Sequence, residues 1–115
     1  MNADPDCIFC KIVAGQIPAK KVFEDEELLA FHDIHPWAPV HVLLIPKVHI
    51  ASLAEVGSVH DALLGRMLGL APRLMKELGV VNGFRTVINT GRDGGQEVQH
   101  LHMHVFGGPR PWQRG

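Results

Sequence analysis

Three histidines at alternate positions, His100, His102 and His104, are the residues of this sequence best suited to chemistry. Side chains alternate between the two faces of a β-strand, so a strand over residues 100–106 would carry all three imidazoles on one face. The apolar residues between them would face the other side and pack against a helix. A row of imidazoles needs hydrogen-bond partners, a ligand or a metal. We therefore predict a functional site at this segment.

A row of imidazoles suits chemistry at phosphorus. A histidine nucleophile needs one ring nitrogen free while an acceptor holds the other as N–H. Protonated imidazole and backbone N–H groups stabilise the oxygens of a phosphoryl group under attack. In the loop 90–96 just before the histidines, Gly94 and Gly95 let backbone N–H groups approach an anion, because they have no Cβ. The pattern favours a phosphoryl substrate, with a single catalytic metal on the three imidazoles as an alternative.

Cys7 and Cys10 are the two cysteines of the sequence. A Cys-x-x-Cys pair supplies half of a tetrahedral zinc site, and two further nitrogen or sulfur ligands would complete it. In a reducing compartment we expect such a pair to bind metal or to be redox-active rather than to form a structural disulfide. The alternative is a metal-free thiol pair that fills space near the N-terminus.

The composition is that of an ordinary globular domain. The 115 residues are 46% hydrophobic and 20% charged, and the formal net charge is −1, so there is no general basic field for nucleic acid or an anionic membrane. No apolar run approaches the ~20 residues that span a bilayer. Residues 1–6 lack the basic start and apolar run of a signal peptide. We expect a cytoplasmic protein with no nucleic-acid or membrane partner.

Short apolar runs predict the strands that must position these side chains. The run 41–46 is almost continuously apolar, which is typical of a buried central strand. The runs 21–24 and 28–33 have the spacing of a hairpin. The expected strands are 21–24, 28–33, 41–46, 84–89 and 100–106. Hairpin-like spacing early and late in the chain favours an α+β fold with an antiparallel sheet of about five strands over βαβ winding.

Two helices are expected as well. Asp6 could cap a short helix over residues 7–14. A long helix begins at Ser58, where the sequence resembles a capping box, and its apolar residues recur at helical spacing. Pro72 lies inside this helix. Because an interior proline costs ~3 kcal/mol, we expect a bend near residues 68–72 or a break into two pieces.

The His-x-His-x-His run, with apolar residues between and after it, resembles the signature of the histidine-triad (HIT) family. The resemblance covers residues 7–112 and points to the Hint branch, in its bacterial type with an N-terminal Cys-x-x-Cys. The other matching stretches are Phe31-His32-Asp33-Ile34, Ile45-Pro46-Lys47-Val48-His49-Ile50, Ile88-Asn89-Thr90-Gly91, Gly94-Gly95-Gln96, Gly107-Gly108 and Trp112. The resemblance implies one HIT domain over residues 1–115, with a core at 7–108 and short tails.

The Hint branch is similar to purine nucleoside phosphoramidases, so the resemblance implies an enzyme, a hydrolase that cleaves the P–N bond of adenosine 5′-phosphoramidates. It implies that His102 attacks the α-phosphorus and forms a nucleotidyl-histidine intermediate, which water hydrolyses. His104 would contact the phosphate, and His41 would support the catalytic histidines. Further phosphate contacts would come from Asn89, Gly95, Gln96 and Glu97. No organic cofactor is implied.

By the same resemblance, Asp33 would bind the ribose hydroxyls of an AMP-like purine nucleotide. The base would be enclosed by Ile8, Phe9, Phe31 and Ile34. The residues themselves also allow plainer roles. Asp33 could cap the turn before Pro36, and Asn89 could be a turn residue. His41, on an apolar strand, could be a hydrogen-bonded core histidine.

Glu97 departs from the familiar form of the branch, which has serine at this position near the leaving group. A carboxylate donates no hydrogen bond unless it is protonated, and it repels phosphate. Its side chain could point away and leave only its backbone N–H in the site, or it could accept a proton on the side of the leaving amine. The departure concerns leaving-group preference and not the nucleophile.

The resemblance also implies a metal and a partner. Some bacterial members with the Cys-x-x-Cys pair are similar in holding one structural Zn²⁺, and the corresponding ligands here are Cys7, Cys10, His49 and His100. A closed four-ligand site has no open position for catalysis, which would leave His102 and His104 for chemistry. The family further implies a homodimer, in which two sheets join and the C-terminal tail reaches toward the active site of the partner.

Other functions stay open at this point. The same histidine could serve a dinucleoside polyphosphate hydrolase or a nucleotidyl transferase. A function of another class is that of a nucleotide- or zinc-binding interaction protein with vestigial catalysis, although the intact histidine row and Asn89 argue against it. Trp37 and Trp112 could mark an interface, as exposed tryptophans often do, or could pack their own loops.

Overall fold

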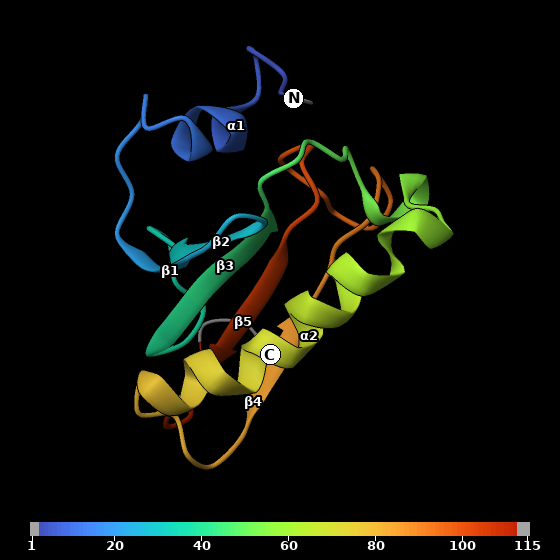
Figure 1. Ribbon diagram of the computed structural model, residues 1–115. Coiled ribbons are helices and arrows are strands. Elements are labelled where there is room, and N and C mark those ends of the chain that lie inside the picture. The colour runs from blue at the N-terminus through green and yellow to red at the C-terminus, as the bar shows by residue number, and fades with distance from the viewer. Residues whose placement is uncertain (1–2, 113–115) are drawn as a thin grey trace.

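The computed structural model describes residues 3–112, which form a five-stranded antiparallel sheet flanked by two helices (Figure 1). The strands are β1 (Lys21–Glu24), β2 (Leu28–His32), β3 (Val40–Pro46), β4 (Phe84–Val87) and β5 (Met103–Gly107), in the spatial order β1-β2-β3-β5-β4. The helices are α1 (Ile8–Val13) and α2 (Asp61–Glu77), with the 3-10 turns η1 (Leu53–Glu55) and η2 (Ser58–His60) between β3 and α2. This confirms the α+β fold expected from the sequence.

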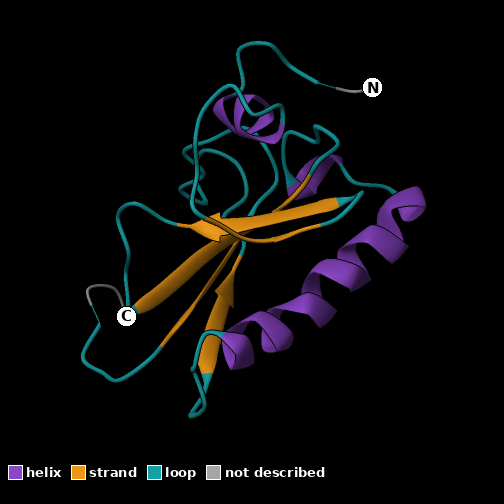
Figure 2. Ribbon diagram, turned by 60° about the vertical axis from the view of Figure 1, so that its left-hand side comes forward, coloured by secondary structure: helices purple, strands orange, loops and turns teal. Residues whose placement is uncertain are grey.

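The central strands are buried on both faces of the sheet, which explains their continuous apolar runs. One face packs against α2, which lies alongside the sheet in Figure 2, through Leu28, Ala30, Val42 and Leu44. The opposite face packs against α1 through Leu29, Phe31, Leu43 and Ile45. His104 lies directly opposite Leu43 in the β3–β5 register. Since opposed residues of an antiparallel pair share a face, His104 lies on the same face as α1.

The histidine-rich segment is a strand only in its second half. β5 begins at Met103, so His100 and His102 lie in an irregular segment and not in the strand expected over residues 100–106. The reason lies at the end of β3, where the carbonyl oxygen of Pro46 accepts a hydrogen bond from Nε2 of the His100 side chain at 2.8 Å. The expected alternation persists nevertheless. The apolar members, Leu101, Met103 and Val105, are all buried in the core against α2.

Several elements end at different residues from those expected. The cap of α1 is Cys7 rather than Asp6, because the Cys7 sulfur accepts the backbone N–H of Cys10 at 3.3 Å. β2 stops at His32 and β4 stops at Val87, each before the expected end of its run. The N-cap thus comes from a residue chosen from the sequence as a metal ligand.

The long helix begins later than expected and is not interrupted. The residues from Ser58 form η2, and α2 begins only at Asp61. α2 then continues through Pro72, so the break considered for residues 68–72 does not occur (Figure 1). Pro72 is exposed, and water can satisfy the carbonyl group that its missing N–H leaves unpaired. No helix within residues 3–112 is long and apolar enough to cross a bilayer.

Arg66 of α2 anchors the turn between β1 and β2. Its guanidinium group pairs with the carboxylate of Asp25, and it donates to Oε1 of Glu27 at 2.5 Å. The Arg66 hydrogen bond, together with two backbone N–H donors, lowers the pKa of Asp25 to about 2. A lowered carboxyl pKa stabilises the folded state above the ordinary value of 3.8, and this stabilisation is lost as the pH falls through about 2.

We expect Arg66→Gln to reduce stability modestly at neutral pH, and we expect the difference from wild type to shrink as the pH approaches 2. Urea unfolding across this range measures both effects. The same substitution in an Asp25→Asn background should lose most of its pH dependence. Equal pH dependence in the two backgrounds would show that Asp25 is not the titrating partner.

Candidate functional site

His102 is held in the protonation state of a nucleophile. Its Nδ1 lies 2.7 Å from the backbone carbonyl oxygen of His100, and a carbonyl only accepts, so Nδ1 carries the proton and donates. The lone pair is therefore on Nε2. Burial lowers the pKa of His102, which keeps the ring neutral near neutral pH. A neutral imidazole with a fixed tautomer and a free Nε2 is the form that attacks phosphorus.

A second chain of hydrogen bonds fixes the proton of His104. The backbone N–H of Trp37 donates to Nδ1 of His41 at 3.0 Å, so the proton of neutral His41 is on Nε2. That Nε2 lies 2.9 Å from Nδ1 of His104, which therefore accepts and carries its own proton on Nε2. Burial lowers the pKa of His41 and favours its neutral form, although Asp33, 3.5 Å away, opposes this effect. His104 thus becomes a hydrogen-bond donor.

His102 and His104 line a cleft of about 1040 Å³ on the face of the sheet next to α1. The residues expected at a nucleotide site that also line this cleft are Ile8, Phe9, Phe31, Asp33, Ile34, Asn89, Gly95 and Glu97. The Phe9 ring meets Phe31 and His102 edge to face, with ring centroids 5.7 and 5.2 Å away. One end of the cleft is therefore aromatic and apolar, and the histidines lie beside it.

Asp33 and Gln96, two further residues of the expected site, also have hydrogen bonds within the protein. Oδ1 of Asp33 accepts the backbone N–H of His35 at 2.7 Å, so Asp33 does cap the turn before Pro36 as well as lining the cleft. Gln96 is buried. Its amide group donates to the carbonyl oxygens of Ala51 and Val98 and accepts the backbone N–H of Gly91. The Gln96 side chain therefore holds the loop in place and does not line the cleft.

The cleft-facing loop depends on Gly94. A Cβ at this position would collide with the backbone of Thr90, so only glycine fits the turn as built. The adjacent Gly95 has a φ of +81° and lines the cleft. These two residues therefore allow the close backbone approach that an anion requires.

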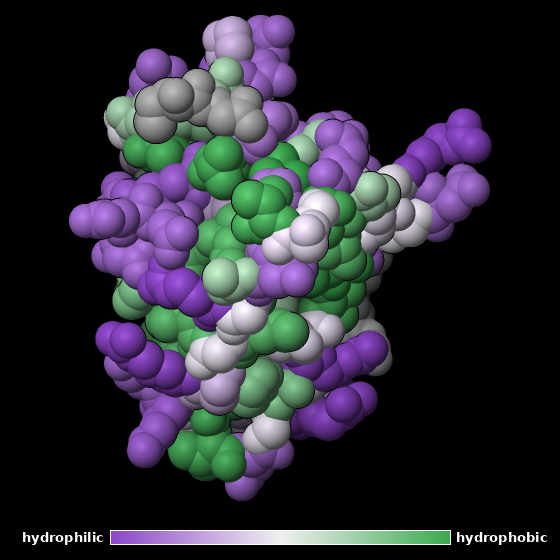
Figure 3. All heavy atoms as spheres, turned by 45° about the vertical axis from the view of Figure 1, so that its right-hand side comes forward, coloured by the Kyte–Doolittle hydropathy of each residue, from purple (hydrophilic) through white to green (hydrophobic). Residues whose placement is uncertain are grey.

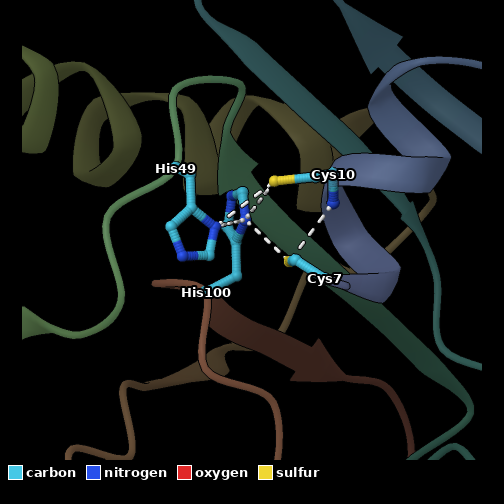
Figure 4. A group of neighbouring side chains, drawn as sticks. All are labelled: Cys7, Cys10, His49 and His100. Atoms are coloured by element: carbon cyan, nitrogen blue, oxygen red, sulfur yellow. Dashed lines mark hydrogen bonds between the residues drawn. The ribbon is translucent and has the colours of Figure 1, made fainter. Parts of the chain in front are cut away.

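Cys7, Cys10, His49 and His100 converge beside α1 (Figure 4). Their ligand atoms all lie within 4.8 Å of one another, and the distances between pairs include 3.4 Å from Cys7 Sγ to His100 Nδ1, 3.3 Å from Cys10 Sγ to His49 Nδ1 and 3.2 Å between the two Nδ1 atoms. A tetrahedral ion with bonds of roughly 2.0–2.3 Å places its ligand atoms about 3.3–3.8 Å apart. The four side chains can therefore hold a metal.

The protonation of these side chains also suits a metal. His100 donates from Nε2 to Pro46, which leaves its Nδ1 lone pair directed at the sulfur atoms. Burial lowers the pKa of His100 to about 4, so Nδ1 carries no proton at neutral pH. Both cysteines are free thiols, and burial raises the pKa of Cys10, which a bound cation would reverse.

The three histidines therefore serve different purposes. Nδ1 of His100 faces the cysteines, Nδ1 of His102 donates to a carbonyl group, and Nδ1 of His104 accepts from His41. Within residues 3–112, no group of candidate metal ligands contains all three. The alternative of a single metal on the whole row is thus incompatible with this geometry.

Sequence reasoning missed the position of Trp37. Its ring stacks on His104 with a centroid distance of 4.3 Å and an interplanar angle of 21°, and it lies 4.7 Å from the His41 ring. Trp37 and Trp112 are half-buried and both contact Phe106 of β5, so each side chain packs partly against the sheet. Their role at an interface stays a prediction. The proline-rich loop around Trp37 gave no sign of this contact.

Comparison with known proteins matches a HIT domain to residues 14–110. Among curated relatives, the protein HitA of Neisseria gonorrhoeae is 55% identical over 104 residues, which cover 90% of this chain and 97% of the relative. The purine nucleoside phosphoramidase of Escherichia coli strain K12 is 42% identical over 104 residues, which cover 90% of this chain and 87% of the relative.

Two solved structures agree with the fold. A HIT family hydrolase from Legionella pneumophila Philadelphia 1 has 47% identity and a TM-score of 0.88, covering 91% of this chain and 95% of that chain. A zinc-bound histidine triad family protein from Mycobacterium smegmatis has 35% identity and a TM-score of 0.76, covering 87% and 73%. On the domain match and these identities, the chain belongs to the HIT domain family.

Proposed function

We propose that this protein is a hydrolase that cleaves purine nucleoside 5′-phosphoramidates through a nucleotidyl-histidine intermediate at His102. The observation that carries the proposal is the hydrogen bond from Nδ1–H of His102 to the His100 carbonyl, which leaves Nε2 free inside the cleft. The family membership and the phosphoramidase among the relatives support the same reaction.

The reaction has two displacements at phosphorus. Nε2 of His102 attacks the α-phosphorus, the P–N bond of the substrate breaks, and the leaving nitrogen takes up a proton from solvent to depart as the amine. Water then attacks the same phosphorus and gives up a proton to solvent, the bond to His102 breaks, and the 5′-nucleotide is released. The Nε2–H of His104 and the side chain of Asn89 stabilise the phosphoryl oxygens, together with the backbone at Gly95.

The base and the ribose bind at the other end of the cleft. Asp33 accepts hydrogen bonds from the ribose hydroxyls, which its position in the cleft permits alongside its role in the turn. The base lies between the apolar side chains of Ile8, Phe9, Phe31 and Ile34. Ile34 is 85% exposed in the free protein, and a bound base would cover part of it.

The test is intact-mass spectrometry after mixing protein with adenosine 5′-phosphoramidate and quenching without acid. We expect a transient AMP adduct on the wild type and release of AMP at turnover, with neither for His102→Ala. His60→Ala is the control, because His60 lies in η2 and does not line the cleft. Absence of both adduct and AMP would overturn the proposal. Nucleotide binding without turnover would then favour an interaction protein.

Glu97 should determine which leaving groups are accepted. Glu97 lines the cleft together with His102. A carboxylate directed into the cleft would repel the anionic leaving group of a dinucleoside polyphosphate more than a neutral or cationic amine. We expect Glu97→Gln to raise kcat/KM for a dinucleoside polyphosphate about fivefold relative to the phosphoramidate. Steady-state assays of both substrates on both proteins measure this ratio. An unchanged ratio would mean that the Glu97 side chain points away from the leaving group.

We further propose that Cys7, Cys10, His49 and His100 hold one structural Zn²⁺. The donor set, the spacing of the ligand atoms and the unprotonated Nδ1 of His100 support this assignment. The ion would tie α1 to the segment before β5 and would neutralise the two thiolates. It would take no part in the reaction, because four protein ligands leave no open position.

We also propose a homodimer. β4 lies at the edge of the sheet, and Phe84 on this strand is 37% exposed. Apolar side chains also reach the surface on the face drawn in Figure 3. Light scattering coupled to size exclusion should give twice the mass of the chain. The expected reach of the C-terminal tail partly concerns residues 113–115, which lie outside the described residues.

A further inference from the structure

Trp37 touches both members of the hydrogen-bonded histidine pair. It lies in the loop between β2 and β3, and its ring stacks on His104 and tilts over His41, with centroid distances of 4.3 and 4.7 Å. The same ring lies nearly perpendicular to that of Phe106, with a centroid distance of 5.2 Å. The three contacted rings come from the neighbouring strands β3 and β5. The half-buried Trp37 lines the cleft together with one of them, His104.

The backbone of Trp37 acts on the same pair. Its N–H donates to Nδ1 of His41, and this bond places the His41 proton on Nε2, facing His104. Pro36 and Pro39 stand on either side of the tryptophan, and their fixed φ angles restrict the loop that presents this N–H. The main chain and the side chain of Trp37 therefore constrain both His41 and His104.

The stacked ring limits how His104 can turn. Rotation about the last side-chain torsion of histidine is soft, and a half-turn would exchange Nδ1 with a carbon atom. Such a turn would break the hydrogen bond from His41 and remove the reason for the proton to stay on Nε2. To make it, the imidazole must sweep through the space that the indole occupies at 4.3 Å.

We infer that Trp37 is a positioning residue, whose indole holds His104 in the orientation that presents Nε2–H to the phosphoryl oxygens. The part of this inference that concerns turnover rests on the proposed function. The part that concerns the tautomer of His104 does not. A Trp37 that merely filled space in the loop would affect stability and leave both the tautomer and kcat unchanged.

The test compares Trp37→Ala and Trp37→Phe with wild type. Alanine removes the ring and keeps the backbone N–H, while phenylalanine keeps a ring that can stack. For adenosine 5′-phosphoramidate we expect Trp37→Ala to lower kcat about 10- to 100-fold with KM changed less than about threefold, because misplacement of a group by 1 Å can cost that much. Trp37→Phe should retain most of kcat.

The matched control is Phe23→Ala, which removes an aromatic ring from the core on the α2 side of the sheet. It should lower the melting temperature and leave kcat unchanged. The readout independent of activity is nitrogen-15 NMR of the histidine rings, with His104 assigned by difference from His104→Ala. We expect one sharp signal pair with the proton on Nε2 in wild type, and a mixture of tautomers or exchange broadening in Trp37→Ala.

Any one of three results for Trp37→Ala would overturn the inference. The protein could lose stability with kcat unchanged, like the Phe23→Ala control. Its loss of kcat/KM could come from KM alone, or its His104 tautomer could be that of wild type. Failure of the proposed function can be distinguished from failure of this inference. In that case the wild type would show neither adduct nor turnover, while the NMR comparison would still decide whether Trp37 positions His104.

Discussion

Replacement of His102 by alanine is expected to lower kcat/KM for adenosine 5′-phosphoramidate by at least about 10⁴-fold, the usual scale for loss of a covalent nucleophile. The hydrogen bond to the His100 carbonyl gives His102 the free Nε2 on which the proposed reaction depends. The nearby His104 cannot replace it, because its Nδ1 accepts from His41 and its proton is therefore on Nε2. Steady-state kinetics measure the loss. Calorimetric titration with AMP should show affinity within about threefold of wild type, since the other cleft residues remain.

Chemical rescue separates a missing nucleophile from a damaged fold. His102→Gly leaves space for free imidazole, which can attack the substrate in place of the side chain. We expect activity to rise with imidazole concentration in His102→Gly and not in His104→Gly, whose role is to donate a hydrogen bond from a fixed position. Activity within about tenfold of wild type in His102→Ala would contradict the covalent route.

Removal of the proposed Zn²⁺ is expected to lower the melting temperature by about 10–30 °C. A ligand present at 1,000 times its Kd contributes about 4 kcal/mol, and each 1 kcal/mol shifts the melting temperature of a small domain by several degrees. The loss follows because α1, a helix of six residues, is linked through Cys7 and Cys10 to His49 and His100, far along the chain. Circular dichroism melts with and without a strong chelator, together with metal analysis of the purified protein, measure the effect.

Cys10→Ser provides the matched control for this prediction. The variant should melt at the lower temperature whether or not chelator is present, and added Zn²⁺ should not restore it. His60→Ala should show the same shift on addition of chelator as wild type, because His60 lies outside the cluster. A protein that purifies without metal, and whose melting temperature does not respond to zinc, would refute the structural site and leave the metal-free thiol pair.

Local patterns predicted most of the sheet because its strands are short, apolar and separated by turn residues. β1 has the expected bounds, and β3 differs by one residue at its start. The predicted start of β5 was wrong, because the strand begins only after the His100 side chain has bonded to the end of β3. The continuity of α2 through Pro72 depends on exposure, which periodicity does not reveal.

Spacing and family resemblance pointed to the four residues of the Cys/His cluster and to most residues that line the cleft, with Gln96 as an exception. The tautomers of the histidines could not be predicted from the sequence. They follow from which carbonyl or N–H faces each ring nitrogen, as in the pairs of His102 with His100 and of His41 with Trp37. Trp37 was missed for the same reason, since its ring and its N–H reach histidines on β3 and β5 only after the loop has closed.

Residue 100 has two roles that are carried by different atoms. Its imidazole belongs to the cysteine cluster, whereas its backbone carbonyl fixes the proton of His102. Every amino acid has the same carbonyl, so a substitution at this position discards the ligand and retains the acceptor. The two roles are therefore genetically separable. A lineage could exchange the proposed metal for an apolar core around α1 and still inherit the acceptor for the proposed nucleophile, provided that the segment before β5 keeps its path.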